Sequence, residues 1–184
     1  VGHPLVEVVE KKLIVDSRQL TEENVDALSI VNHQPSTKII ALLPGSRKQE
    51  IAKKLPIMLS VAAHFPDYQF VVAKAPGLED DFYTPFLNTA SNVSSVRNQT
   101  YDLLMKATAA LVTSGTATLE TALFAVPEVV CYKGSWASYQ IAKRVITLKY
   151  ISLVNLIMDE EVVTELIQED CSTKRIREEL KKLI

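Results

Sequence analysis

Short apolar runs alternate along most of the chain with longer segments in which apolar residues recur at helical spacing. Uninterrupted apolar runs are typical of strands that are buried on both faces of a parallel sheet. The expected strands cover residues 39–43, 68–73, 93–96, 109–112, 128–133 and 151–154. The expected helices cover residues 21–29, 51–62, 78–90 with a break near Pro85, 101–107, 119–126, 136–146, 161–168 and 172–184. This alternation predicts an α/β fold, a Rossmann-like parallel sheet with helices on both faces, followed by C-terminal helices.

The same pattern divides the chain into three parts. We expect residues 1–36 to form a linker and an entry helix, residues 37–158 the Rossmann-like domain, and residues 159–184 the C-terminal helices. The sequence begins at Val1, without Met, and an apolar residue runs directly into a turn. We therefore expect it to start inside a longer protein, with a processed terminus as the alternative.

Composition narrows the function classes. Hydrophobic residues make up 47% and charged residues 23% of the chain, a balance typical of globular proteins. The net charge of −2 gives no electrostatic case for nucleic acid as a partner. Cys131 and Cys171 lie far apart without a CxxC pattern, which favours reduced, structural thiols in a cytosolic protein over a disulfide or a metal site. No apolar run is long enough to span a bilayer.

The most informative stretch is the turn at residues 113–116, between an expected strand and helix. Ser114 or Thr116 can cap the helix, and Gly115 allows another group to approach the backbone closely. Free N–H groups at the positive end of a helix dipole bind phosphate well. Glu120 lies one helical turn after Thr116, where a carboxylate can accept hydrogen bonds from sugar hydroxyls. The turn therefore indicates a nucleotide diphosphate or nucleotide-sugar site, although an ordinary α/β corner with Glu120 as a surface charge remains open.

A second turn of the same kind follows the first strand. Gly45 and Ser46 offer backbone amides, and Arg47 can hold a phosphate in a bidentate fork. The stretch lacks the GxxxxGK[ST] pattern and is therefore not a P-loop. The alternative is an arginine at the start of a helix that pairs with Glu50. Residues 133–135 form a third polar turn, and because all three turns follow strands, we expect them to face one crevice.

Several motifs taken together resemble lipid-A-disaccharide synthase. They are LLPGSR at 42–47, TSGTATLE at 113–120, AKR at 142–144, YISLVNL at 150–156 and ELIQ at 165–168, with GHP at 2–4. They occur in the order of that family and match only its C-terminal half. The resemblance implies a GT-B glycosyltransferase whose C-terminal half binds the nucleotide sugar.

The reaction that the resemblance implies transfers 2,3-diacylglucosamine from UDP-2,3-diacylglucosamine to lipid X, 2,3-diacylglucosamine 1-phosphate, with inversion and release of UDP. The general base is expected in the N-terminal domain, which is missing here, so the fragment alone is expected to be inactive. Such enzymes lie in the cytoplasm of Gram-negative bacteria, and a peripheral contact with the inner membrane and a homodimer stay open.

Within this reading, Arg47 and Asn155 are the expected catalytic residues. Arg47 would offset charge on the leaving UDP, and Asn155 would orient sugar or phosphate, with a helix cap as the alternative. The expected nucleotide-sugar-binding residues are Gly45, Ser46, Ser114, Gly115, Thr116, Glu120, Lys133, Arg144 and Ser152. For Lys133 and Arg144 a solvated surface charge is the alternative. No metal and no cofactor are expected, since the sequence shows no Asp-x-Asp signature. The rival functions are another UDP-sugar transferase or epimerase of the same fold, and a non-catalytic α/β binding module.

Overall fold

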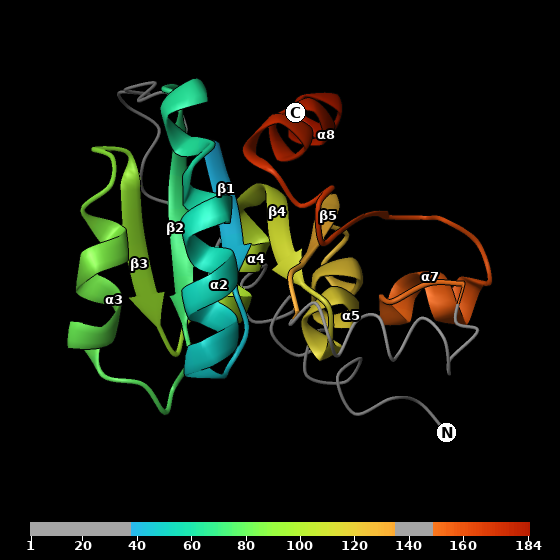
Figure 1. The fold of residues 1–184 in the computed structure, drawn as a ribbon, viewed down its shortest axis with the longest axis horizontal. Helices are drawn as coiled ribbons and strands as arrows, with labels where there is room; N and C mark the ends of the chain where they lie inside the picture. The colour runs from blue at the N-terminus through green and yellow to red at the C-terminus, as the bar shows by residue number, and fades with distance from the viewer. Residues whose placement is uncertain (1–37, 135–148) are drawn as a thin grey trace, which may run out of the picture. The chain divides into compact units, whose positions relative to one another are not determined.

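A six-stranded sheet in which every pairing is parallel forms the centre of the structure, a computed structural model that describes residues 38–134 and 149–184 (Figure 1). The strands are β1 (Lys38–Leu43), β2 (Tyr68–Lys74), β3 (Val93–Arg97), β4 (Ala107–Thr113), β5 (Glu128–Tyr132) and β6 (Thr164–Ile167). Their order is β3-β2-β1-β4-β5-β6. The predicted linker 1–36, the helix 21–29 and the helix 136–146 lie outside the described residues.

Helices cover both faces of this sheet, as the sequence predicts. They are α2 (Lys48–Leu59), the 3-10 turn η1 (Ala62–His64), α3 (Asp80–Leu87), α4 (Thr100–Lys106), α5 (Thr116–Leu123), α7 (Leu153–Met158) and α8 (Thr173–Leu183). One apolar cluster joins the sheet to α2, α3 and α8 through residues such as Leu55, Tyr83 and Leu180. A second cluster joins the opposite face to α4 and to the segment around α5 through residues such as Leu104 and Phe124.

Two expected elements near the C-terminal end are wrong. Residues 161–168 are not a helix: Thr164–Ile167 form strand β6, which pairs with β5 and buries Leu166. Residues 151–154 are not a strand: α7 begins at Leu153, and the Ser152 side chain caps it by accepting a hydrogen bond from the Asn155 amide. Short apolar segments fit either structure, and here a partner strand and a capping side chain decide.

The strand order reverses between the parallel neighbours β1 and β4, because the chain continues from β1 to β2 on one side and from β4 to β5 on the other. Loops that follow such strands diverge and open a crevice at the carboxyl edge of the sheet, where ligands of α/β proteins bind. In Figure 1 this edge is at the bottom, where the strand arrows point. The loops after β1, β2, β4 and β5 all reach it.

Candidate functional site

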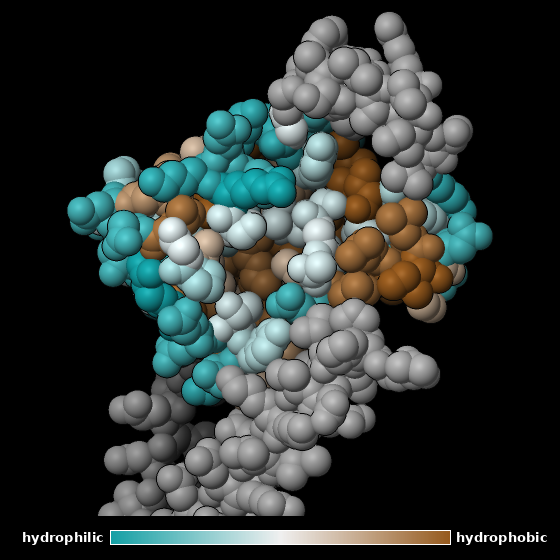
Figure 2. Space-filling model, turned by 90° about the horizontal axis from the view of Figure 1, so that it is seen from below, coloured by the Kyte–Doolittle hydropathy of each residue, from teal (hydrophilic) through white to brown (hydrophobic). Residues whose placement is uncertain are grey.

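A cavity of about 420 Å³ lies at the carboxyl edge of the sheet, at the reversal of strand order. Figure 2 looks at this edge from below and shows a hollow with an apolar floor and more polar side chains around it. The loops that follow β1, β2 and β4 line the cavity, together with the first turns of α4 and α5. Six predicted binding residues line it: Gly45, Ser46, Ser114, Gly115, Thr116 and Glu120.

The turn between β4 and α5 leaves the start of the helix without a side-chain cap. Gly115 is the N-cap residue, with a φ of 144° that strongly favours glycine, and no side chain accepts from the first amides of α5. The expectation that Ser114 or Thr116 caps the helix is wrong. Ser114 instead donates its hydroxyl to the Ile151 carbonyl at 2.7 Å, and Thr116 is the first helical residue. The amides at this helix start therefore remain suited to an anion in the cavity.

Open space surrounds Gly115 on the side where a side chain would stand, since a Cβ there would meet no atom within 4 Å. Gly45, in the loop after β1, is more crowded. Its φ is 110°, and a Cβ would lie 3.1 Å from Glu50 Oε2 and 3.3 Å from Thr113 Cγ2. Glycine is therefore needed at both turns, at Gly45 also because the loop packs closely on the end of β4.

Arg47 lies beside the cavity rather than in it. It is the N-cap residue of α2, and its guanidinium Nη1 contacts Glu50 Oε1 at 3.3 Å. The Arg47 side chain is 82% exposed and lines neither cavity described here. The structure thus contains the Arg47–Glu50 pair that the sequence leaves open as an alternative.

Glu120 lies on the cavity wall, four residues after Thr116 and half-buried. Burial raises the pKa of its carboxyl above the ordinary value of 4.5. A carboxylate that has lost part of its water in this way favours hydrogen-bond donors that a ligand brings.

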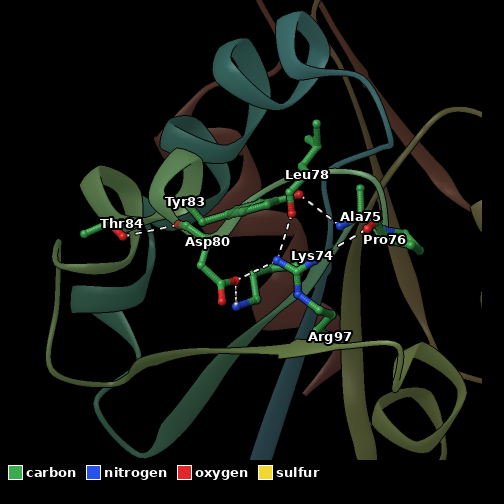
Figure 3. Close-up of polar contacts among 8 residues, drawn as sticks. All are labelled: Lys74, Ala75, Pro76, Leu78, Asp80, Tyr83, Thr84 and Arg97. Carbon is green, nitrogen blue, oxygen red and sulfur yellow. Dashed lines mark hydrogen bonds and ion pairs between the residues drawn. The ribbon is translucent and has the colours of Figure 1, made fainter.

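The loop after β2 forms another wall of the cavity through Lys74, Ala75 and Pro76, and a polar cluster holds it in place (Figure 3). Asp80 Oδ1 accepts from Lys74 at 2.5 Å and from Arg97 at 2.8 Å. Hydrogen bonds from these two cations lower the pKa of Asp80 to about 2.

Backbone contacts complete this anchoring. The buried Tyr83 hydroxyl accepts from the Ala75 amide at 2.9 Å, and Arg97 also donates to the Leu78 carbonyl at 2.8 Å. The wall is therefore fixed before any ligand binds.

A second cavity, of about 250 Å³, adjoins the first and shares Glu50 and Ser114 with it. Predicted residue Lys133 lines it, and so do Lys53 and Lys54 from α2. The sequence analysis did not single out Lys54, which is 4% exposed. A signal was present, because Lys54 falls three residues after Ile51 and four before Met58, on the apolar stripe of the helix.

Ser152 and Asn155 are fully buried and line neither cavity. Asn155 uses its whole amide internally: Nδ2 donates to Val163 O and Glu165 Oε1, and Oδ1 accepts from the Val162 and Val163 amides at 2.8 and 2.9 Å. The Glu165 carboxylate also accepts from the Ile151 and Ser152 amides. The network fixes the segment whose Ile151 carbonyl receives the Ser114 hydroxyl. Arg144 lies outside the described residues.

Beside the hollow in Figure 2 lies an apolar patch, which takes in α7. Its exposed side chains are Leu156, Ile157, Met158 and Val162. No helix within 38–134 and 149–184 is long and apolar enough to cross a membrane. In the same ranges no three His, Cys, Asp or Glu side chains come together as a metal-binding group. Cys131 and Cys171 are buried free thiols in the larger core cluster.

The fold is shared with a solved epimerase and a solved glycotransferase. UDP-GlcNAc 2-epimerase from Neisseria meningitidis, solved with UDP-GlcNAc bound, matches 97% of this chain with 43% of its own, at a TM-score of 0.57 and 18% identity. The glycotransferase of kitacinnamycin matches 85% of this chain with 38% of its own, at a TM-score of 0.54 and 15% identity. The parallel sheet and its helices, together with the likeness to these two solved structures, identify the fold as the Rossmann-like half of the GT-B class.

Within this class, the chain belongs to the lipid-A-disaccharide synthetase family, whose model matches residues 1–184. The lipid-A-disaccharide synthase of Geobacter sulfurreducens is 37% identical over 185 residues, 98% of this chain and 46% of the relative. That of Syntrophus aciditrophicus is also 37% identical, over 98% of this chain and 46% of the relative. The chain thus spans about half the length of the curated relatives it matches.

Proposed function

We propose that the larger cavity binds the UDP moiety of a nucleotide sugar, and that the chain is the UDP-sugar-binding half of a lipid-A-disaccharide synthase. One observation carries the proposal: the uncapped helix start at Gly115 and the half-buried carboxylate of Glu120 line the same cavity. A nucleoside diphosphate brings an anion for the first and ribose hydroxyls for the second.

In this assignment the diphosphate lies against the amides of Gly115 and Thr116, with those of Gly45 and Ser46 across the cavity. Lys133 would contact it from the second cavity. Arg47 would turn from Glu50 toward the phosphates as the bond to UDP breaks. Exposed ion pairs of this kind contribute about 1 kcal/mol or less, so the pair with Glu50 is little obstacle to that movement.

Ser152 and Asn155 would support this site through Ser114. Asn155 holds the segment after α7 and Ser152 caps the helix, and both keep the Ile151 carbonyl in place as the acceptor of the Ser114 hydroxyl. This role assigns them to positioning rather than to contact with the sugar.

For the complete protein, we propose the transfer of 2,3-diacylglucosamine from its UDP derivative to lipid X, with release of UDP. The reaction needs a base for the acceptor hydroxyl, which we assign to the half of the protein that this chain lacks. We also propose that the protein is cytoplasmic and contacts the inner membrane peripherally, because its acylated substrates would lie in that membrane.

Calorimetric titration of the chain with UDP tests the proposal. Saturable binding is expected, and Glu120→Ala is expected to weaken it about tenfold, as the loss of hydrogen bonds to a charged group would. Glu169→Ala is the matched control, because Glu169 is exposed and lies outside both cavities. Absence of UDP binding by the folded chain, or equal binding by Glu120→Ala, would contradict the assignment of this cavity.

A separate assay tests whether catalysis requires the half of the protein to which we assign the general base. The chain alone is expected to form no disaccharide from UDP-2,3-diacylglucosamine and lipid X, whereas the complete protein should form it. Turnover by the isolated chain would mean that the base lies within these residues.

A further inference from the structure

Lys54 is a charged side chain for which the proposed UDP site so far gives no role. It projects from the buried face of α2, and its ammonium group donates a hydrogen bond to Thr113 Oγ1 at the end of β4. Its nearest carboxylate oxygen, Glu50 Oε2, is 3.9 Å away, and the Glu50 side chain is 39% exposed. Burial lowers the pKa of Lys54, because loss of water disfavours the charged form, and Glu50 offsets part of this effect.

The contact determines what the Thr113 hydroxyl can do. An ammonium group only donates, so Thr113 Oγ1 must accept from Lys54, and its own proton must point elsewhere. Across residues 38–134 and 149–184, no protein group accepts that proton. Thr113 is 4% exposed and lines the larger cavity, whereas Lys54 lines the smaller one. The pair therefore lies in the wall between the cavities, with one hydroxyl proton free for a ligand.

The loop after β1 and the start of α5 both lie close to Thr113 in this wall. The Gly45 backbone packs against the Thr113 methyl group and Glu50, and the uncapped start of α5 begins two residues after Thr113. Thr113 and this helix start line the same cavity, so a phosphate held at the helix start would lie on the side of the cavity that Thr113 forms. The Lys54 charge behind the hydroxyl would strengthen its donation, since hydrogen bonds in a chain polarise one another.

We infer that Lys54 is a positioning residue for the diphosphate, which fixes the Thr113 hydroxyl as a donor toward a phosphate oxygen. The inference rests on the proposed function of the larger cavity. It adds two residues, Lys54 and Thr113, that recognise the phosphates rather than the nucleoside.

The test compares Lys54→Met, Thr113→Val and the double variant with the unaltered chain. Methionine keeps the length of the lysine stem and removes the charge, and valine keeps the shape of threonine and removes the hydroxyl. Lys48→Met is the matched control, since Lys48 is an exposed lysine on the same helix outside both cavities. Each protein is titrated with UDP and with uridine and followed by NMR, which also reports whether the variant is folded.

Each single variant is expected to bind UDP about tenfold more weakly and uridine unchanged, because only UDP carries the phosphates. The double variant should be no weaker than the singles, since Lys54 acts through Thr113. Lys48→Met should match the unaltered chain.

The other outcomes separate the two proposals. If the unaltered chain binds UDP and Lys54→Met binds it equally well, the role of Lys54 is overturned and the proposed function stands. Equal weakening toward UDP and uridine would show a general structural role and would also overturn it. If the folded, unaltered chain binds no UDP, the proposed function fails, and the inference fails with it.

Discussion

Glu120 links burial to chemistry at the scale of a single residue. Because burial raises the pKa of its carboxyl, Glu120 takes up a proton at a higher pH than an exposed glutamate does. The protonated form is a poorer acceptor for ribose hydroxyls. Affinity for UDP is therefore expected to fall as the pH falls through this raised pKa. Titrations across a pH series measure the effect, and Glu120→Ala should lose that part of the pH dependence while the titration of UDP itself remains. An identical pH profile for both proteins would support the alternative that Glu120 is a surface charge with no contact to UDP.

Arg47 is the residue whose role depends most on the reaction. Its guanidinium is exposed and contacts only Glu50 among the described residues, so it is free to meet charge that grows on the leaving UDP. In the complete protein, Arg47→Ala is expected to lower kcat at least tenfold and to change KM little. Steady-state kinetics measure this, with Arg47→Lys as the control that keeps the charge. A raised KM with unchanged kcat would assign Arg47 to ground-state binding instead.

At the scale of elements, the Glu165 carboxylate holds the start of α7 to strand β6. It accepts from the Ile151 amide at 2.9 Å, the Ser152 amide at 2.8 Å and Asn155 Nδ2 at 2.9 Å. Glu165→Ala leaves three donors without this acceptor and is expected to lower the free energy of unfolding by about 2 to 4 kcal/mol. Urea denaturation measures the loss.

Hydrogen exchange adds a local measurement for the same variant. The amides of Ile151, Ser152 and Asn155 should exchange faster in Glu165→Ala, because they depend on this carboxylate directly or through Ser152. Glu161→Ala is the control, since Glu161 is exposed on the same connection. Unchanged exchange in Glu165→Ala would show that other contacts hold α7.

At the scale of the whole molecule, Glu128 couples stability to pH. It begins β5 with 3% exposure, and neither carboxylate oxygen has a hydrogen-bond partner within the described ranges. The neighbouring Thr121 hydroxyl donates to the Ala117 carbonyl at 2.8 Å. Burial raises the pKa of Glu128 from 4.5 to about 8. The folded protein therefore keeps this proton near neutral pH, where the unfolded chain has lost it.

The sign of the effect follows from this difference. The free energy of unfolding should fall as the pH rises from about 4.5 to about 8, because the folded state binds one more proton there. Glu128→Gln should remove this decline, which is worth roughly 4 to 5 kcal/mol over the range. Urea denaturation of both proteins at pH 5 and pH 9 measures it. A parallel decline in the variant would show that other groups cause the pH dependence.

The sequence by itself determined the central strands of the sheet, because uninterrupted apolar runs at 39–43, 70–73 and 109–112 are stable only when buried on both faces. It also determined that the glycine turns at Gly45 and Gly115 follow strands and gather at one edge, since parallel strands end together. These features depend on local pattern and on a general rule of topology.

Only the tertiary structure decided which polar groups meet. Residues 164–167 form a strand because they pair with the edge of β5. The Asn155 side chain is buried because Glu165 and two backbone amides form hydrogen bonds with it. The Ser114 hydroxyl donates to the Ile151 carbonyl instead of capping its own helix. Lys54 donates to Thr113, which is 59 residues away in sequence. Partners so distant along the chain leave no periodic signal, because hydrogen bonds depend on positions that only the packed elements define.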